Sequence, residues 1–145
     1  MMKKIHPIAG GVALAMILVF WLSTVLVELW GSQAQIAQVK TLIPWGFLIL
    51  IPAMAAVGST GFRLGQARRG PVVDKKRKRM PIIAANGVLI LIPAAFFLAA
   101  KAQAGAFDAV FYGVQALELA AGAVNITLLW RNMRDGRRLA GKHRR

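Results

Sequence analysis

The feature that most constrains the fold of this chain is a set of four long apolar stretches. They lie at about residues 8–30, 42–62, 81–101 and 107–130. Each is close to the ~20 residues that a helix needs to cross the ~30 Å hydrocarbon core of a bilayer. Because no water inside a bilayer satisfies free backbone groups, such segments fold as helices. The sequence therefore predicts an all-α integral membrane protein with four transmembrane helices.

The connections between the stretches predict how the helices are arranged. Residues 31–41 and 102–106 form short connections, and the basic segment 63–80 contains glycines and a proline that interrupt any single helix. Short connections make sequential helices antiparallel neighbours. We therefore expect one membrane domain over residues 1–145, built as an up-down four-helix bundle, with a basic loop at 63–80 and a basic tail at 131–145.

The positive charge of the chain predicts its orientation. The formal net charge is +14, from 19 Lys and Arg against 5 Asp and Glu. The basic residues gather in the N-terminus, the 63–80 loop and the 131–145 tail, which an up-down bundle places on one side; Lys40 and Lys101 fall on the other. Because basic loops stay in the cytoplasm, we predict a bacterial-type inner-membrane protein with both termini cytoplasmic, N-in and C-in.

This charge distribution also bears on partners. The run KKRKR at 75–79 resembles a nucleic-acid patch. A nucleic-acid footprint also needs a binding fold, and none is visible, so we expect no nucleic-acid partner. The cytoplasmic basic residues are instead expected to contact anionic lipids of the bilayer, at ~1 kcal/mol per residue near the surface. The chain has no cysteine, which excludes disulfides and thiolate metal sites.

The letters LILIPA occur twice, at 48–53 and 89–94, and place Pro52 and Pro93 near the middle of two predicted helices. Each proline removes a backbone hydrogen bond and clashes with the carbonyl four residues earlier, so we expect two kinks near the bilayer midplane. Paired interruptions at one depth indicate a binding site in transporters. The competing interpretation is composition alone, because proline is commoner in membrane helices than in soluble ones.

The fourth predicted helix carries a stripe of polar residues on one face. They are Asp108, Tyr112, Gln115, Glu118 and Asn125. Glu118 lies near the centre of the span, where a charged side chain costs ~2.5 kcal/mol or more, so it should face the protein interior. Two roles stay open for it: a ligand or proton site, or a structural hydrogen bond to a carbonyl freed at a proline kink.

Two further pairs of polar residues match in predicted depth. Asn86 and Asn125 each lie about five residues from the cytoplasmic end of their helix, which would let them bond across the bundle. Glu28 and Lys101 lie near the outer boundary, where they would pair or extend their charged ends to the surface.

His6 and Met80 suggest a cofactor hypothesis. Each precedes a proline at the cytoplasmic end of a predicted helix. Histidine and methionine are a known pair of haem-iron ligands, so one hypothesis is a single b-type haem ligated by His6 with Met80 nearby. The alternative is an ordinary histidine at the membrane interface, because one histidine without carboxylate or thiolate neighbours is a poor metal site. Haem apart, we expect no cofactor.

Three functions follow as hypotheses. No nucleophile–base pair, phosphate loop or paired-carboxylate site is recognisable, so we expect no enzyme activity. The first hypothesis is a non-enzymatic accessory or assembly subunit of a membrane complex, since small residues on the helices favour close packing against a membrane-protein partner or in a homo-oligomer. The second is a small ligand or proton-coupled carrier centred on Glu118. The third is the b-type haem protein ligated by His6.

Overall fold

The computed structural model describes residues 2–66 and 69–141, and within these ranges it contains helices and no strand. Four helical spans are long and apolar enough to cross a membrane. The prediction of an all-helical chain with four membrane-spanning segments is therefore confirmed, and the chain has the character of a multi-pass membrane protein.

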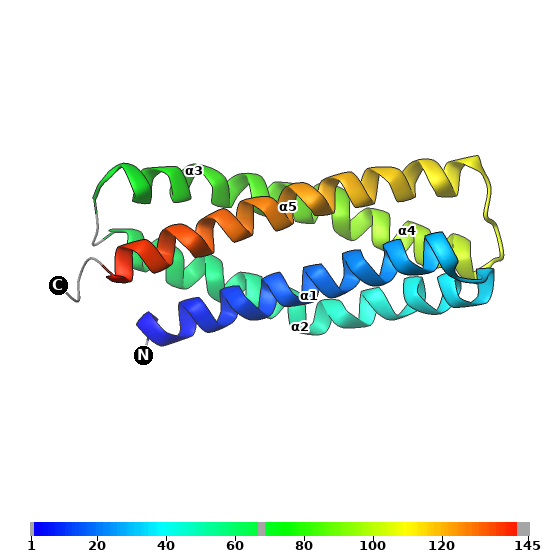
Figure 1. Ribbon diagram of the computed structural model, residues 1–145, viewed down its shortest axis with the longest axis horizontal. Coiled ribbons are helices and arrows are strands. Elements are labelled where there is room, and N and C mark those ends of the chain that lie inside the picture. Colours follow the sequence, from blue (N-terminus) through cyan, green and yellow to red (C-terminus); the bar gives the residue numbers. More distant parts are fainter. Residues whose placement is uncertain (1, 67–68, 142–145) are drawn as a thin grey trace.

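The four spans run side by side along one axis (Figure 1). Their elements are α1 (Met2–Trp30), α2 (Gln33–Gln66), α3 (Pro71–Asn86) with the π-helical η1 (Gly87–Leu91) and α4 (Ile92–Gln103), and α5 (Ala109–Gly141). Successive spans run in opposite directions, so the start of α1, the α2–α3 connection and the end of α5 share one end. We call this the basic end, after its lysines and arginines, and the opposite end the far end.

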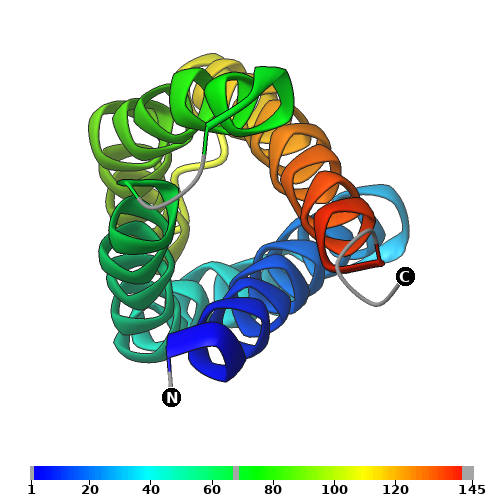
Figure 2. The same cartoon turned by 90° about the vertical axis from the view of Figure 1, so that its left-hand side faces the viewer.

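The view along the axis shows a four-sided arrangement (Figure 2). The helix α1 packs along α2 and α5, and the third span, made of α3, η1 and α4, packs along the same two helices from the other side. The first and third spans therefore lie diagonally across the bundle from each other. A group between them is bounded by all four spans.

The helix α2 begins nine residues earlier than the predicted span, at Gln33 rather than 42. A reciprocal pair of hydrogen bonds starts it: Ser32 N donates to Gln35 Oε1 (2.8 Å) and Gln35 N donates to Ser32 Oγ (3.3 Å). This capping box satisfies two amides that would otherwise lack partners at the helix start. Most of the predicted loop 31–41 is consequently helical, so Lys40 lies within α2 rather than in a loop.

The basic segments also contain more helix than predicted. Within the segment 63–80, where a loop is expected, α2 continues to Gln66 and α3 begins at Pro71. Gly70 has a left-handed φ of 137°, and Pro71 occupies the first turn of α3, where its missing N–H has no cost. The helix α5 likewise runs through the predicted tail to Gly141. Lys and Arg are good helix formers, so leaving the apolar region does not end a helix. The expected break between the second and third spans is confirmed.

Pro93 follows a change in helix type. The N–H of Ile92 bonds to the carbonyl of Gly87, five residues earlier, so the chain makes a wide π-helical turn directly before the proline. Pro52 lies inside the continuous helix α2. Both proline side chains are exposed on the surface of the bundle rather than facing its interior.

Buried apolar side chains form three clusters along the bundle axis. The basic-end cluster consists of Leu14, Ile17, Ile83 and Leu129. The middle cluster consists of Ile43, Phe47 and Ala95. The far-end cluster consists of Ile36, Leu98, Ala102 and Phe111. The outer surface is also apolar, with large side chains such as Leu26 and Leu89 exposed, as expected for helices that face lipid rather than water.

Candidate functional site

An ion pair lies inside the bundle, between α2 and α5. Lys40 Nζ is 2.6 Å from Glu118 Oε2, and Lys40 exposes 0% of its side chain and Glu118 12%. Lys40 Nζ also donates a hydrogen bond to Thr24 Oγ1 of α1 (3.3 Å). Ionisable groups within a membrane span are costly unless paired. Here the pairing ties three helices together.

The register of α2 explains why Lys40 points inward. Ile36, Lys40, Ile43 and Phe47 are all buried and follow one another at spacings of three or four residues. Such spacing keeps side chains on one face of a helix. The capping box at Ser32 sets the start of the helix and extends this face past Lys40. Lys40 therefore occupies a position on the buried face of α2 where the spacing of the other residues predicts an apolar side chain.

Gln115 and Glu28 complete the site. Gln115 Nε2 donates to Glu118 Oε2 (2.9 Å), and Glu28 of α1 interacts electrostatically with both Lys40 and Glu118. We call Thr24, Glu28, Lys40, Gln115 and Glu118 the polar cluster. It contains two carboxyl groups and one ammonium group. With all three ionised it carries a negative formal charge, which a proton or another cation would neutralise.

Two oxygens of the polar cluster lack donors. Glu28 Oε1 and Gln115 Oε1 are buried and have no hydrogen-bond partner in the part of the chain that the structure describes. A buried acceptor without a donor costs ~1–3 kcal/mol. Turning the Gln115 amide over would not help, because its oxygen would then face the Glu118 carboxylate. A proton or a hydrogen-bond donor taken up by the cluster would satisfy these acceptors.

Apolar layers flank the Lys40–Glu118 pair on both sides along the axis. On α2, Ile36 of the far-end cluster lies one turn before Lys40, and Ile43 of the middle cluster lies one turn after it. On α5, Phe111 of the far-end cluster is fully buried two turns before Glu118. Lys40 and Glu118 therefore lie between two apolar layers, whereas Glu28 follows Val27 of the far-end layer and is partly exposed.

The structure divides the predicted stripe on α5. Gln115 and Glu118 join the polar cluster, whereas Tyr112 is 48% exposed on the bundle surface. The hydrogen bond considered between Glu118 and a carbonyl freed by Pro52 or Pro93 is not the arrangement found, since Glu118 Oε2 accepts from Lys40 and Gln115. Both prolines lie outside the site because they occupy the exposed faces of their helices.

The expected bond between Asn86 and Asn125 is confirmed. Asn86 Nδ2 donates to Asn125 Oδ1 (2.8 Å) and to the carbonyl of Ala121 (2.8 Å). Asn125 Nδ2 in turn donates to the carbonyl of Ile83 (3.3 Å). The pair joins the third span to α5 at a level nearer the basic end than Glu118, and both side chains have protein partners.

Lys101 pairs with Asp108 instead of Glu28. The Lys101 Nζ–Asp108 Oδ2 distance is 2.6 Å, and Asp108 Oδ1 accepts from the amide of Phe111 (2.9 Å) at the start of α5. The hydrogen bond from Lys101, followed by that from Phe111, holds the pKa of Asp108 below its ordinary value. Glu28 is thereby left to the polar cluster, because Lys101 has a nearer carboxylate in its own hairpin.

His6 and Met80 each contact a different helix. His6 Nδ1 lies 2.9 Å from Thr60 Oγ1 of α2, and the Met80 sulfur accepts a hydrogen bond from Asn132 Nδ2 of α5 (3.4 Å). Within residues 2–66 and 69–141, no group of three or more histidines and carboxylates is placed to hold a metal ion. Haem ligation by His6 stays a prediction.

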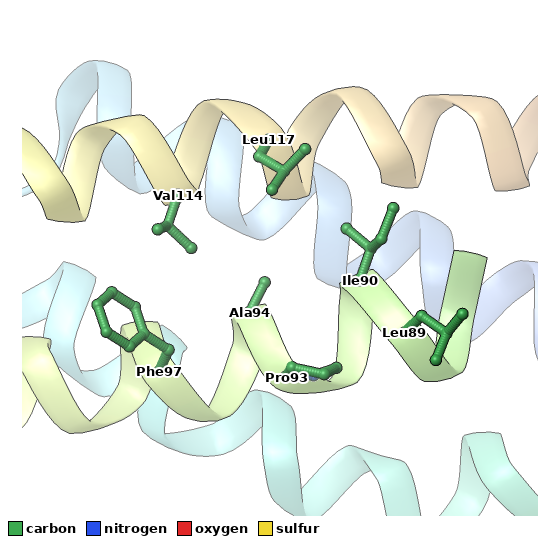
Figure 3. Close-up of a pocket in the computed structure, with 7 residues that line it drawn as sticks. All are labelled: Leu89, Ile90, Pro93, Ala94, Phe97, Val114 and Leu117. Atoms are coloured by element: carbon green, nitrogen blue, oxygen red, sulfur yellow. The ribbon is translucent and has the colours of Figure 1, made fainter. Parts of the chain in front are cut away.

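An apolar groove lies on the bundle surface between the third span and α5 (Figure 3). Its volume is about 340 Å³. The lining residues are Leu89, Ile90, Pro93, Ala94, Phe97, Val114 and Leu117. The groove is open to the outside and carries no polar side chain, so a lipid chain suits it better than a polar ligand.

Three residues of the polar cluster, Thr24, Glu28 and Lys40, lie outside the site predicted from sequence. The sequence signal that could have found Lys40 is its spacing of three or four residues from Ile36 and Ile43, both apolar and buried.

No protein-family model matches this chain, and neither a curated protein nor a solved structure matches it.

Proposed function

We propose that this protein is a small proton-coupled carrier of a bacterial-type cytoplasmic membrane, with the polar cluster as its coupling site and no enzyme activity. One observation carries the proposal: a Lys40–Glu118 ion pair lies between apolar layers, and a second carboxyl group, that of Glu28, acts electrostatically on both of its members. Ionisable residues inside membrane spans are costly and typically belong to proton relays or substrate pathways. A carboxylate in excess of its counter-ion gives a proton a place to bind.

The distribution of charge supports an orientation for the carrier. The start of α1, the stretch from the end of α2 through the first half of α3, and the last part of the chain from Arg131 onward hold most of the 19 Lys and Arg residues. Because such segments stay in the cytoplasm, the basic end would be cytoplasmic and the far end would face outward. Anionic lipids of the cytoplasmic leaflet would then contact the basic end.

The ion pair suggests how proton binding would act on the bundle. Lys40 of α2 is held by Glu118 of α5. A proton on Glu118 would remove the Coulomb attraction that joins these helices, and this attraction is strong in a low-dielectric interior. Loss of the proton would restore it. The helices α2 and α5 lie diagonally across the bundle, and the ion pair reaches between them. The protonation state would therefore bias how far α2 and α5 stand from each other, and a carrier needs such a bias between conformations.

The test uses charge movement, because it needs no knowledge of the transported substrate. The protein in proteoliposomes is adsorbed on a solid-supported membrane, and rapid pH jumps are applied. We expect a transient current in the wild type that Glu118→Gln abolishes. Asp108→Asn is the matched control, since Asp108 is an exposed carboxylate outside the cluster, and it should keep the current. A wild type without a transient, or one unchanged in Glu118→Gln, would contradict the proposal.

A second candidate function is an accessory subunit of a membrane complex. The observation that favours it is a row of small side chains on the outer face of α5: Gly113, Ala116 and Ala120 are all exposed. Small residues let a neighbouring helix approach closely within the membrane. Replacing Ala116 and Ala120 with leucine should release a partner in native gels of solubilised membranes. An unchanged complex size would count against this function.

A further inference from the structure

The hydrogen bonds around His6 define which ring nitrogen carries a proton. His6 Nδ1 lies 2.9 Å from Thr60 Oγ1, and Thr60 Oγ1 donates its hydrogen to the carbonyl of Ala56. A hydroxyl group has one proton to donate. Because that proton is used by Ala56, Thr60 must accept from the histidine. Nδ1 of His6 is therefore the protonated nitrogen.

The same contacts assign the lone pair to the other nitrogen. In a neutral imidazole one nitrogen donates and the other accepts, so Nε2 of His6 carries the lone pair. The ring is held close to α2, because a Cβ at Gly61 would lie 3.0 Å from His6 Cε1. The backbone carbonyl of Val57, which can only accept, takes a hydrogen bond from the ring. The helix α2 thus fixes both the position and the tautomer of His6.

The charged surroundings favour exchange over tight retention of a second proton. Burial of the ring and, after it, the charge of Lys76 of α3 disfavour a second proton on His6. The helix α2 presents Thr60 and Gly61, which do not ionise. Histidine takes up and releases protons in the physiological pH range. A proton bound at Nε2 would accordingly be released again.

We propose that His6 is the proton-exchange group at the basic end, taking up and releasing at Nε2 the protons that serve the polar cluster. This inference rests on the proposed function. A proton from water forms the Nε2–H bond and leaves by the same bond, whereas Nδ1–H stays bonded to Thr60 throughout. His6 and Glu28 lie ~33 Å apart along α1 at 1.5 Å per residue, which is about the thickness of the hydrocarbon core. One helix therefore carries an ionisable group near each boundary.

An apolar layer lies between His6 and Glu118. The basic-end cluster, which includes Leu14 and Ile83, lies between His6 and the Asn86–Asn125 pair along the axis. Transfer from His6 toward Glu118 therefore requires the bundle to open at this cluster. Protons taken up by His6 would reach the polar cluster only when this layer opens, which is the behaviour of a gated carrier rather than of an open proton channel.

The first arm of the test reads the tautomer. The full chain is labelled with ¹⁵N-histidine in a His143→Gln background, so that His6 is the remaining histidine. In nitrogen-detected NMR the neutral ring should show a protonated Nδ1 and an unprotonated Nε2, and acidification should shift Nε2. Thr60→Val removes the acceptor and should give a mixture of tautomers. A wild-type ring protonated at Nε2 when neutral would overturn the inference.

The second arm applies pH jumps separately to each side of uniformly oriented proteoliposomes. His6→Gln should lose the fast transient from the basic end and keep the one from the far end, whereas Glu118→Gln should lose both. A basic-end transient unchanged in His6→Gln, but abolished in Glu118→Gln, would overturn the role of His6 and leave the carrier proposal standing. Absence of any transient in the wild type would overturn both. If His6→Gln does not fold, Thr60→Val should slow the basic-end transient, and an unchanged rate would overturn the role.

Discussion

Lys40 and Glu118 lie 2.6 Å apart between α2 and α5, and none of the Lys40 side chain is exposed. The pair joins two helices that are separated by the whole third span in sequence. Replacing either residue removes the other's partner in the ion pair. Because the pair lies between apolar layers, water does not easily replace that partner. This coupling, rather than the presence of a charge in a span, defines the site.

Loss of one partner should be more damaging than loss of both. Lys40→Met or Glu118→Gln alone leaves a buried group unpaired, and breaking a buried pair costs ~3–5 kcal/mol. The double variant Lys40→Met with Glu118→Gln should be more stable than Lys40→Met, since it leaves no carboxylate at position 118. Reversible unfolding in mixed micelles measures both effects. Additive losses in the double variant would show that the two residues are not coupled.

The asparagine pair should contribute little. Asn86→Ala and Asn125→Ala each remove the 2.8 Å bond between the third span and α5. Hydrogen bonds between helices in membrane proteins average ~0.6 kcal/mol. A double-mutant cycle on unfolding free energies should return a coupling energy of that order. A coupling of several kcal/mol would mean that the pair, and not the polar cluster, holds α5 in place.

Two glycines of α5 should respond in opposite ways to alanine. A Cβ at Gly122 would lie 2.9 Å from Trp21 Cδ1, and Trp21 Nε1 donates to the carbonyl of Leu119 (2.9 Å). Gly122→Ala should displace the indole, weaken this bond and lower the thermal unfolding temperature. Gly113 has open space around it, so Gly113→Ala should be neutral or stabilising by up to ~1 kcal/mol. Equal destabilisation by both would argue against close packing at Gly122.

The far-end hairpin should weaken in acid. The pKa of Asp108 is lowered by Lys101 and by the amide of Phe111. A carboxyl with a lowered pKa stabilises the folded state fully above its ordinary value of 3.8, and this contribution is lost as the pH falls through the lowered value. The amide signal of Phe111 in NMR should therefore shift at a pH below 3.8. Asp108→Asn should abolish this titration, and a midpoint at or above 3.8 would contradict the ion pair.

Sequence reasoning located the spans and one of the contacts. The four spans follow from apolar length, because crossing a bilayer fixes both how long and how apolar a helix must be. The contact between Asn86 and Asn125 follows from depth, since polar groups at one level of a narrow bundle find each other. Both inferences use only distance along a helix axis, which the sequence supplies directly.

The partner of Glu118 could not be found in the same way. The polar stretch before Thr41 resembles a loop by composition, and the capping box of Ser32 and Gln35 is what makes it helical. Once it is helical, Lys40 falls on the buried face of α2. Which helices adjoin α5, and at what rotation, is set by packing of all four spans. The π-helical turn before Pro93 is likewise a tertiary outcome, because proline alone does not specify it.

The central claim is that the polar cluster binds a proton, and infrared difference spectroscopy tests it most directly. Glu28 and Glu118 are the two glutamates of the chain, and both belong to the cluster. In protein labelled with ¹³C-glutamate, lowering the pH should produce the carbonyl band of a protonated carboxyl group that shifts with the label. The band should weaken in Glu118→Gln and vanish when Glu28→Gln is added. A spectrum with no label-sensitive band across the range in which the protein stays folded would contradict the claim.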